Sequence, residues 1–443
     1  MAATPSTQTV TLASLFDAQR PPAEELLREC VHCGFCLPAC PTYMLWREEM
    51  DSPRGRIYLM QMAANGKAGA IDQSFVEHFD RCLGCMSCMS ACPSGVQYDK
   101  LIEATRAQIE RLHRRPFWDR AYRDVIFAVF PHPGRLRALA LPLRAYQRLG
   151  IRSLVERSGL LKLLPPRLQS MHDLLPEIRS SNEQCPEHVV PRGVPRRRVG
   201  VVLGCVQRVF FQRVNSATIR VLAAEGCEVV APKLQGCCGA LATHVGRDEE
   251  SREAARRMID TFEHLNVDDI AINAAGCGSN LKSYGHLLHD DPHYAEKARQ
   301  FAAKCRDVSE ILASLKPMAE RHPLKVRAAY QDSCHLLHAQ GVRLQPRSLL
   351  RGIAGLELVD VPESHVCCGS AGVYNLLEPE TARQLGERKA ANVLRMKADV
   401  LVSGNPGCLL QITKELRRSG QKIPAYHFIE LLDASIQGSE LPR

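Results

Sequence analysis

The sequence has few aromatic residues and no long apolar run, and each shortage excludes a class of protein. Phe, Trp and Tyr make up 5% of its 443 residues, which gives no support to a surface that stacks on nucleic-acid bases. No run of about 18 apolar residues occurs, so we expect no transmembrane helix. The stretch from Met1 to Gln19 lacks a basic region followed by an apolar one, so we expect no secretory signal.

Cysteine, in contrast, is abundant, and 16 of the 19 cysteines fall into motifs with metal-ligand spacing. Two runs near the N-terminus, from Cys30 to Pro41 and from Cys82 to Pro93, both have the spacing C-x2-C-x2-C-x3-C-P. This spacing is typical of bacterial ferredoxins that hold a pair of [4Fe-4S] clusters. Because thiols kept for metal need a reducing compartment, we expect a cytoplasmic protein.

The ferredoxin pattern also predicts which cysteines share a cluster. Three thiolates at x2 spacing bind one cluster, and the fourth, which precedes proline, binds the other. Cluster 1 is therefore expected to be held by Cys30, Cys33, Cys36 and Cys92, and cluster 2 by Cys82, Cys85, Cys88 and Cys40. This crossing would place the clusters close enough to exchange an electron, which indicates an electron-transfer module.

Zinc sites and disulfides fit these two runs less well. Structural zinc sites usually consist of two separated C-x2-C pairs, without three consecutive x2 steps closed by Cys-Pro. A disulfide framework is typical of small secreted domains, whereas this chain has 443 residues and no expected secretion signal.

The C-terminal half contains an internal repeat with eight further cysteines. The first quartet is Cys205, Cys237, Cys238 and Cys277, and the second quartet is Cys334, Cys367, Cys368 and Cys408. Corresponding cysteines lie 129, 130 or 131 residues apart, which indicates a duplication. We expect a metal or redox role for both quartets, because buried structural cysteines have no reason to cluster at strand ends in both copies.

Strands and helices alternate in each repeat. We expect strands over residues 198–203, 228–231 and 269–274 in the first repeat and over 326–331, 356–361 and 400–403 in the second, with helices over 213–225 and 248–265. This alternation implies right-handed crossovers and parallel sheets. Ligands of such sheets gather at the carboxyl ends of strands, so each quartet is expected to meet at one rim.

We therefore predict an α+β or α/β chain, in which an α-helical ferredoxin domain with two clusters precedes two tandem α/β repeats. The expected divisions are a polar tail over residues 1–20, the ferredoxin domain over 21–110, a basic helical bridge and linker over 111–197, and the repeats over 198–320 and 321–443.

Positive charge is concentrated in the bridge. Residues 111–167 hold 13 Arg and Lys against three acids, a net charge of +10 that exceeds the +9 of the whole chain. Apolar clusters interleave with these arginines, as in amphipathic segments that lie on an anionic membrane. The same pattern fits a bridging helical layer that packs on a partner subunit, and the sequence leaves both open.

Five single residues are further candidates. Arg54 and Arg56 belong to an expected turn over residues 51–56, where they either tune the clusters by charge or are solvated. Three histidines, His335, His338 and His365, lie beside cysteines of the second quartet, where they either assist a proton-coupled step or are structural.

Together these motifs resemble those of a known family. They are Cys30 to Pro41, Ser52 to Tyr58, Arg81 to Val96, Gly204 to Gln207, Gly236 to Gly239, Gly276 to Gly278, Cys367 to Gly372, Asn405 to Cys408 and Glu430 to Asp433. The chain is similar to the iron-sulfur subunits of bacterial glycolate oxidase (glycolate dehydrogenase), with tandem cysteine-rich (CCG) domains as in heterodisulfide-reductase-type proteins. The resemblance covers nearly the whole chain apart from the N-terminal tail and the basic segment.

The resemblance implies a role in a complex. A partner flavoprotein with FAD would oxidise glycolate, and this chain would carry the electrons through two [4Fe-4S] clusters toward the membrane quinone pool. It would hold no FAD and no catalytic residue of its own, and it would lie peripherally on the cytoplasmic face of the inner membrane. The quartets would hold further iron-sulfur clusters, serve at the quinone end or act as redox-active thiols.

The sequence departs from the wider CCG pattern, which ends in C-x-x-C. The first of these two positions is Ala274 in one repeat and Asn405 in the other. Four thiolates per repeat remain, which suffice in number for a cluster. The loss argues against catalysis of the heterodisulfide-reductase type.

Three alternatives stay open. In the first, the chain is the equivalent subunit of a complex that oxidises glycerol 3-phosphate or lactate. In the second, it is a self-contained thiol-disulfide oxidoreductase with its chemistry at the quartets. In the third, it is a binding scaffold whose clusters are structural.

Overall fold

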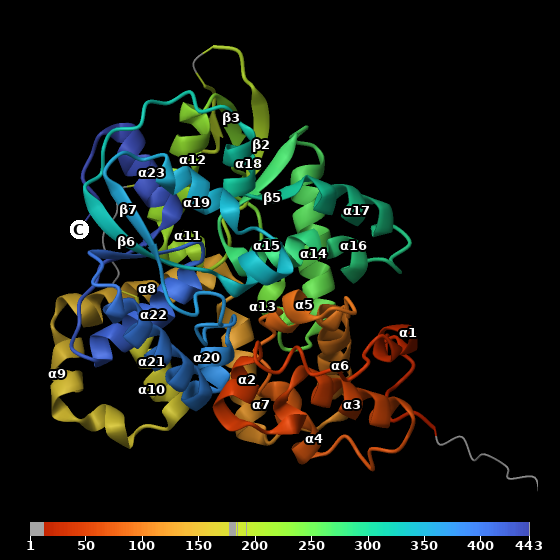
Figure 1. The fold of residues 1–443 in the computed structure, drawn as a ribbon. Helices are drawn as coiled ribbons and strands as arrows, with labels where there is room; N and C mark the ends of the chain where they lie inside the picture. Colours follow the sequence, from red (N-terminus) through yellow and green to blue (C-terminus); the bar gives the residue numbers. More distant parts are fainter. Residues whose placement is uncertain (1–12, 177–182, 184, 192, 443) are drawn as a thin grey trace, which may run out of the picture.

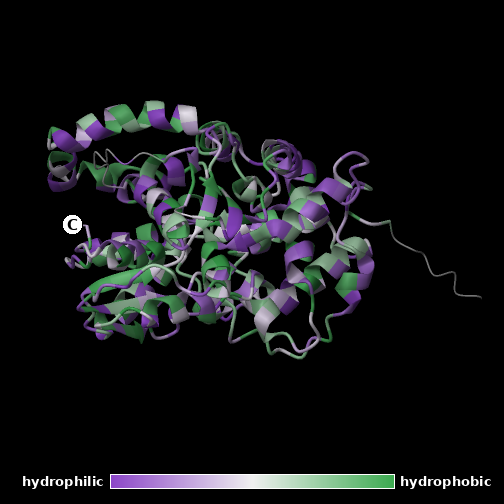
Figure 2. Ribbon diagram, turned by 90° about the horizontal axis from the view of Figure 1, so that it is seen from above, coloured by the Kyte–Doolittle hydropathy of each residue, from purple (hydrophilic) through white to green (hydrophobic). Residues whose placement is uncertain are grey.

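The computed structural model describes residues 13–176, 183, 185–191 and 193–442. The first 12 residues of the expected polar tail lie outside this range. Figure 1 shows helical N-terminal and linker regions side by side, with two sheets and their helices packed against them. Figure 2 shows hydrophobic residues along the strands and both hydrophobic and hydrophilic residues on the peripheral helices. Within the described residues, no helix combines the length and the apolar character that crossing a membrane requires.

The N-terminal region is helical, and its helices frame the two cysteine runs. They are α1 (Glu24–Arg28), α2 (Pro41–Trp46), the 3-10 turn η1 (Glu49–Asp51), α3 (Pro53–Ala64), α4 (Gln73–Asp80), α5 (Ser87–Ala91) and α6 (Tyr98–Leu112). Pro41 starts α2 directly after Cys40, a position that suits proline because the first turn of a helix needs no N–H donor. The proline of the first run thus ends the cysteine loop by starting a helix.

The expectation of a turn over residues 51–56 is wrong, because α3 already begins at Pro53. The Ser52 hydroxyl accepts a hydrogen bond from the Gly55 amide (3.0 Å) and caps the helix. Arg56 therefore projects from the first turn of α3 and is fully buried. It is not solvated, whereas Arg54 remains partly exposed beside Glu49.

Arg56 connects three segments of the N-terminal region. Its Nε donates to the carbonyl of His78 (2.6 Å), its Nη1 donates to the carbonyl of Asp51, and its Nη2 lies 3.5 Å from the Asp51 carboxylate. Asp51 has no exposed surface and also contacts His78 and Arg81. A buried charge is stable only when it is paired and hydrogen-bonded, and here both conditions are met.

The linker region contains α7 (Phe117–Val129), α8 (Pro133–Arg148), α9 (Ile151–Ser158), η2 (Leu160–Leu163) and α10 (Pro166–Asp173). Asp80 of α4 pairs with Arg115 and Arg123, and Asp119 of α7 pairs with Arg123 and Arg167. On the other side, the Ser170 hydroxyl donates to the carbonyl of Asn375 (2.8 Å). The segment is thus a helical bridge between parts of the same chain.

The first repeat contains β2 (Arg197–Val201), α11 (Gln207–Phe210), α12 (Gln212–Ala224), β3 (Cys227–Val230), α13 (Ala240–Thr243), α14 (Asp248–Glu263), β4 (Asp269–Ile272), α15 (Ala275–Lys282), α16 (Tyr284–Leu287), α17 (Ala295–Lys304), β5 (Cys305–Asp307) and α18 (Val308–Ser314), and β1 (His188–Val189) joins its sheet. The second contains β6 (Val326–Gln331), the π-helical turn η3 (His335–Ala339), α19 (Leu344–Arg351), β7 (Leu356–Asp360), α20 (Tyr374–Leu377), α21 (Pro379–Arg395), β8 (Val400–Ser403), α22 (Pro406–Arg418), β9 (Ala425–His427) and α23 (Phe428–Gln437).

Both sheets have the same topology. Their orders are β1-β3-β2-β4-β5 and β7-β6-β8-β9, and all pairs are parallel except that of β1 with β3. Parallel sheets were expected, but the fourth parallel strand of each repeat was not. Strands β5 and β9 have three residues each, too short for a hydrophobic pattern to indicate them.

The two repeats contribute to one common hydrophobic core, besides a smaller core within each repeat. Helix α12 of the first repeat packs against α23 of the second, and α18 of the first packs against α19 of the second. Val201, Val229, Tyr330, Val402 and Phe428 are all buried in the same cluster. Helices of the two repeats therefore pack against each other across this common core.

Replacing Arg56 by Met is expected to lower the free energy of unfolding by about 3–5 kcal/mol, because it leaves the buried Asp51 carboxylate without one of its cationic partners. Chemical unfolding followed by circular dichroism under anaerobic conditions measures the change. The matched control is Arg54→Met, whose pair with Glu49 is partly exposed and is worth about 1 kcal/mol or less. Equal losses for both variants would contradict this account of Arg56.

Candidate iron-sulfur and thiol sites

The eight N-terminal cysteines surround two small cavities. Cys30, Cys33, Cys36 and Cys92 line one cavity, and Cys40, Cys82 and Cys85 line the other. Cys88 lines both. The fourth cysteine of each run thus lies with the first three cysteines of the other run, although the described residues bring no three Cys, His, Asp or Glu side chains together around a single metal ion.

The two cysteine loops have the same backbone conformation. His32 and Gly84, two residues after the first cysteine of each run, both have a positive φ, and so do Gly34 and Met86. A positive φ is unusual for His and Met. Its recurrence at equivalent positions shows that both loops curl in the same way, and the Gly84 amide lies 3.4 Å from the Cys82 sulfur.

Two buried arginines favour a thiolate at Cys82. Burial raises the pKa of this thiol, but the charges of Arg56 and Arg106 outweigh burial and lower the pKa below its usual value. Arg106 also donates to the carbonyls of Phe79 (3.0 Å) and Cys82. Because iron binds thiolate and not thiol, these side chains fit a cysteine that holds an iron-sulfur cluster.

The cysteines of each quartet lie close together at one edge of their sheet. The sulfur atoms of Cys205 and Cys237 are 3.5 Å apart, and those of Cys334 and Cys367 are 3.8 Å apart. Cys277 and Cys408 each occupy the first turn of a helix that follows a strand, α15 or α22. The structure therefore brings together the sets that the spacing predicted.

The surroundings of the quartets differ at equivalent positions. Gly204, Ala240 and Ala274 of the first repeat are replaced by Ser333, Ser370 and Asn405 in the second. The Asn405 amide donates to the Cys408 sulfur at 3.4 Å. The buried Lys389 adds a nearby cation: burial lowers its pKa to about 8, and the neighbouring Cys368 and Cys367 oppose this effect.

The second quartet also lies beside the second cysteine loop. Cys85 shares a packed cluster with Cys367 and Leu83. The Nε2 of His335 donates to the carbonyl of Gly84 (2.7 Å), and the Tyr374 hydroxyl donates to the carbonyl of Arg81 (2.9 Å). The cysteines therefore form a continuous series from the cavity at Cys30 to the second quartet.

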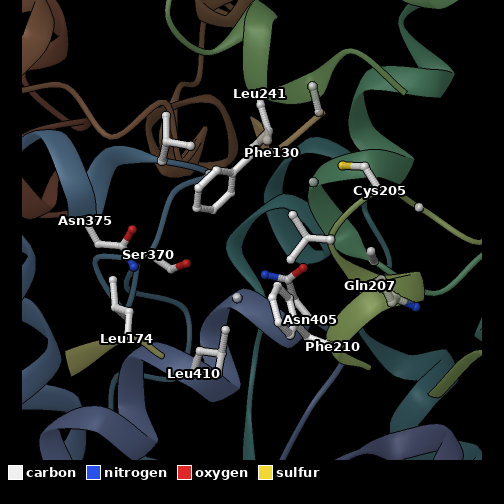
Figure 3. Close-up of a pocket in the computed structure, with 18 of the residues that line it drawn as sticks. Phe130, Leu174, Cys205, Gln207, Phe210, Leu241, Ser370, Asn375, Asn405 and Leu410 are labelled. Carbon is white, nitrogen blue, oxygen red and sulfur yellow. The ribbon is translucent and has the colours of Figure 1, made fainter. Parts of the chain in front are cut away.

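Both quartets line one large cavity, which the sequence did not reveal. The cavity has a volume of about 360 Å³, and Figure 3 shows apolar side chains of the linker and of both repeats around it, among them Phe130, Leu174 and Leu410. Cysteines of the two repeats thus face a common space that the linker helices cover.

Of the candidate histidines, one lines the large cavity and another lies outside it. His335 is buried and lines the large cavity. His338 lies further out, where its Nδ1 is 2.8 Å from the Ser90 hydroxyl and its Nε2 donates to the carbonyl of His365 (2.9 Å). His244 also lines the cavity and lies 4.8 Å from His335 between ring centroids. Sequence reasoning missed His244, because it lies in no motif.

Three family descriptions match separate parts of the chain. A 4Fe-4S dicluster domain matches residues 26–96, the linker region of the glycolate oxidase iron-sulfur subunit matches residues 118–175, and a cysteine-rich domain matches residues 199–282 and 328–413. The expectation that the basic segment lies outside the resemblance is therefore wrong, because the linker match covers most of it.

Relatives align over most of the sequence. A "Probable glycolate oxidase iron-sulfur subunit" of Bacillus subtilis is 39% identical over 92% of this chain and 93% of its own length. The "Glycolate oxidase iron-sulfur subunit" of Escherichia coli is 35% identical over 94% and 95%. "Lactate utilization protein A" of Geobacillus kaustophilus is 33% identical over 54% of this chain and 99% of its own length.

The fold and the cysteine sites define an iron-sulfur protein with a dicluster domain and two cysteine-rich repeats. Its order of domains, including the linker, is matched along almost the whole length of its relatives. The chain belongs to the glycolate oxidase iron-sulfur subunit family.

The exposure of the thiols predicts their order of alkylation in protein freed of metal by a chelator. Iodoacetamide is expected to label the exposed Cys33 before Cys367, because the thiol contact with Cys334 and burial both raise the pKa of Cys367 well above its usual value. Since thiolate is the reactive form, Cys367 should remain poorly labelled at neutral pH. Mass spectrometry of peptides measures the order, and equal labelling of both cysteines would contradict the described packing.

Proposed function

We propose that this chain is the electron-transfer subunit of a flavin-dependent glycolate dehydrogenase. An FAD subunit oxidises glycolate, and electrons leave through this chain toward membrane quinone. The observation that carries the proposal is the continuous series of cysteine-lined sites from Cys30 through Cys88 and Cys85 to Cys367. The names of the two full-length relatives supply the substrate.

We propose the crossed ligand sets for the two clusters: Cys30, Cys33, Cys36 and Cys92 for cluster 1, and Cys82, Cys85, Cys88 and Cys40 for cluster 2. The two cysteine-lined cavities support this assignment. Bound there, the clusters would supply one-electron redox chemistry at potentials that charge and hydrogen bonds set. The chain's own residues would hold them, with Arg56 and Arg106 stabilising the thiolate of Cys82. Both quartets remain proposed ligands of further clusters.

The expected divisions of the chain are also kept as a proposal, with one qualification. The ferredoxin domain would span residues 21–110, the bridge and linker 111–197, and the repeats 198–320 and 321–443. Because the repeats share one core, they would unfold together and not as two independent units.

The ligand assignment predicts the result of replacing Cys88 by Ser. The variant should lose about four iron atoms per chain, the content of one [4Fe-4S] cluster. Glycolate-dependent dye reduction by the reconstituted complex should fall with it. Iron analysis after anaerobic purification and a dye assay measure both.

The matched control is Cys185→Ser, a partly buried cysteine outside every motif whose sulfur contacts the Ser216 hydroxyl. It should keep its iron and its activity. Unchanged iron and dye reduction in Cys88→Ser would exclude the proposed path.

A lactate-oxidising complex is a second candidate, because the lactate utilization protein matches this chain over 99% of its own length. That match covers 54% of this chain, whereas the glycolate oxidase relatives match 92% and 94% of it. Purifying the chain with its flavoprotein and comparing glycolate with lactate as reductant decides between the two candidates.

We further propose that the linker lies on the anionic cytoplasmic face of the membrane. Apolar side chains are exposed there, among them Leu154 (69%), Leu160 (57%) and Leu163 (82%). Arg148, Arg157 and Lys162 are exposed beside them. Apolar residues interleaved with cations are typical of segments that bind the interface of anionic lipids.

Replacing Leu154 and Leu163 together by Ser is expected to weaken binding to anionic phospholipid vesicles by about tenfold or more, because each exposed leucine loses its transfer into lipid. Vesicle cosedimentation measures the binding, which should also fall at high salt. The control is Leu234→Ser, which removes a leucine that is 95% exposed but lies outside the linker. Absence of binding by the unaltered protein would refute the membrane contact.

A further inference from the structure

The large cavity combines an apolar lining with a few polar groups. Phe130, Leu136, Leu174 and Leu376 contribute to the apolar part of its lining. Gln207 and His335 also line it, and each has a buried acceptor atom, Oε1 of Gln207 and Nδ1 of His335, without a hydrogen-bond partner among the described residues. Binding pockets of this kind combine apolar walls with a few polar groups that orient a ligand.

Helix α8 forms the side of the cavity that reaches the surface. Leu136, Leu139, Ala140 and Leu143 line it, at the i, i+3, i+4 and i+7 positions of one helical face. Leu136 is buried, whereas Leu139 is 53% exposed although it lines the cavity. The cavity therefore opens beside Leu139, on the same linker that carries the exposed leucines.

We propose that this cavity binds the ring of a lipophilic quinone, with its tail leaving past α8 toward the surface. The inference rests on the proposed function and adds the place where the acceptor binds. Cysteines of both repeats lie at the cavity wall, so electrons that reach the second quartet arrive beside the bound ring. Clusters held by the quartets would take up the cysteine side of the cavity, and the ring would lie against the apolar side that Phe130, Leu136 and Leu174 line.

The reaction proposed at this site is the reduction of the quinone to a quinol. The quinone takes up two electrons, which originate from the flavoprotein, and two protons from water, and becomes a quinol. No other bond forms or breaks. The quinol brings two O–H donors, which the unpaired acceptors of Gln207 and His335 are suited to receive. The oxidised ring brings only acceptors, to which the hydroxyl of Ser370, another residue of the lining, is suited to donate.

The test uses anaerobically purified full-length protein with its clusters and a benzoquinone that carries a ten-carbon tail. Calorimetric titration should give saturable binding. Ala140→Trp should weaken it by about tenfold or more, because the indole fills the side of the cavity past which the tail leaves. Ala138→Trp, on the exposed face of the same helix and outside the cavity, should bind like the unaltered protein.

Iron content and circular dichroism establish that both variants are folded, and a second wall variant, Leu410→Trp, repeats the test from the second repeat. Absence of saturable binding by the unaltered protein, or equal binding by all variants, overturns the site. Failure of glycolate to reduce the iron-sulfur centres of the complex overturns the proposed function instead and leaves the calorimetric result unchanged, so the two failures are distinguishable.

Discussion

The contact between the second cysteine loop and the second repeat is the interaction on which the rest of the structure depends. His335 donates to the carbonyl of Gly84, Tyr374 donates to the carbonyl of Arg81, and Cys85 packs with Cys367. These contacts place the second quartet directly beside the cysteine loop, while Arg20 with Asp248 (2.9 Å) and Arg106 with the carbonyl of His244 (2.8 Å) hold the same region to the first repeat. Because the hydrogen bonds of His335 and Tyr374 use backbone carbonyls of the cysteine loop, they fix the loop itself and not merely its side chains.

Duplication provided two equivalent thiol sites, but their surroundings have diverged. The strand order and the positions of the four cysteines are the same in both repeats. The second quartet has Ser333, Ser370, Asn405 and the buried Lys389 around it, whereas the equivalent small positions of the first are apolar. Hydrogen-bond donors and a buried cation stabilise negative charge. The second quartet, which lies next to Cys85, is thus the one suited to hold added electron density.

The sequence predicted the regular parts well, because they depend on local patterns. Strands near Val201, Val229 and Tyr330 follow from apolar runs, and the cysteine sets follow from spacing and repetition. What it did not predict depends on tertiary packing. Nothing in the neighbourhood of Arg56 indicates that its guanidinium is buried against Asp51, and nothing near His244 indicates that it meets His335. The common cavity of the two quartets depends on how the repeats pack together, which no local pattern encodes.

The net charge of the linker does not tell which of its arginines are paired inside the molecule and which are exposed. Arg115, Arg123 and Arg167 pair with Asp80 and Asp119 inside the molecule, so they hold the bridge in place and do not attract a distant surface. Exposed cations such as Arg157 remain at the outer side. The repeats supply the cysteines of the cavity, but α8 and the segment from Met171 to Pro176 supply much of its apolar wall. The isolated repeats would therefore present the two quartets to water, and only the full chain encloses them in an apolar environment that a lipophilic molecule can enter.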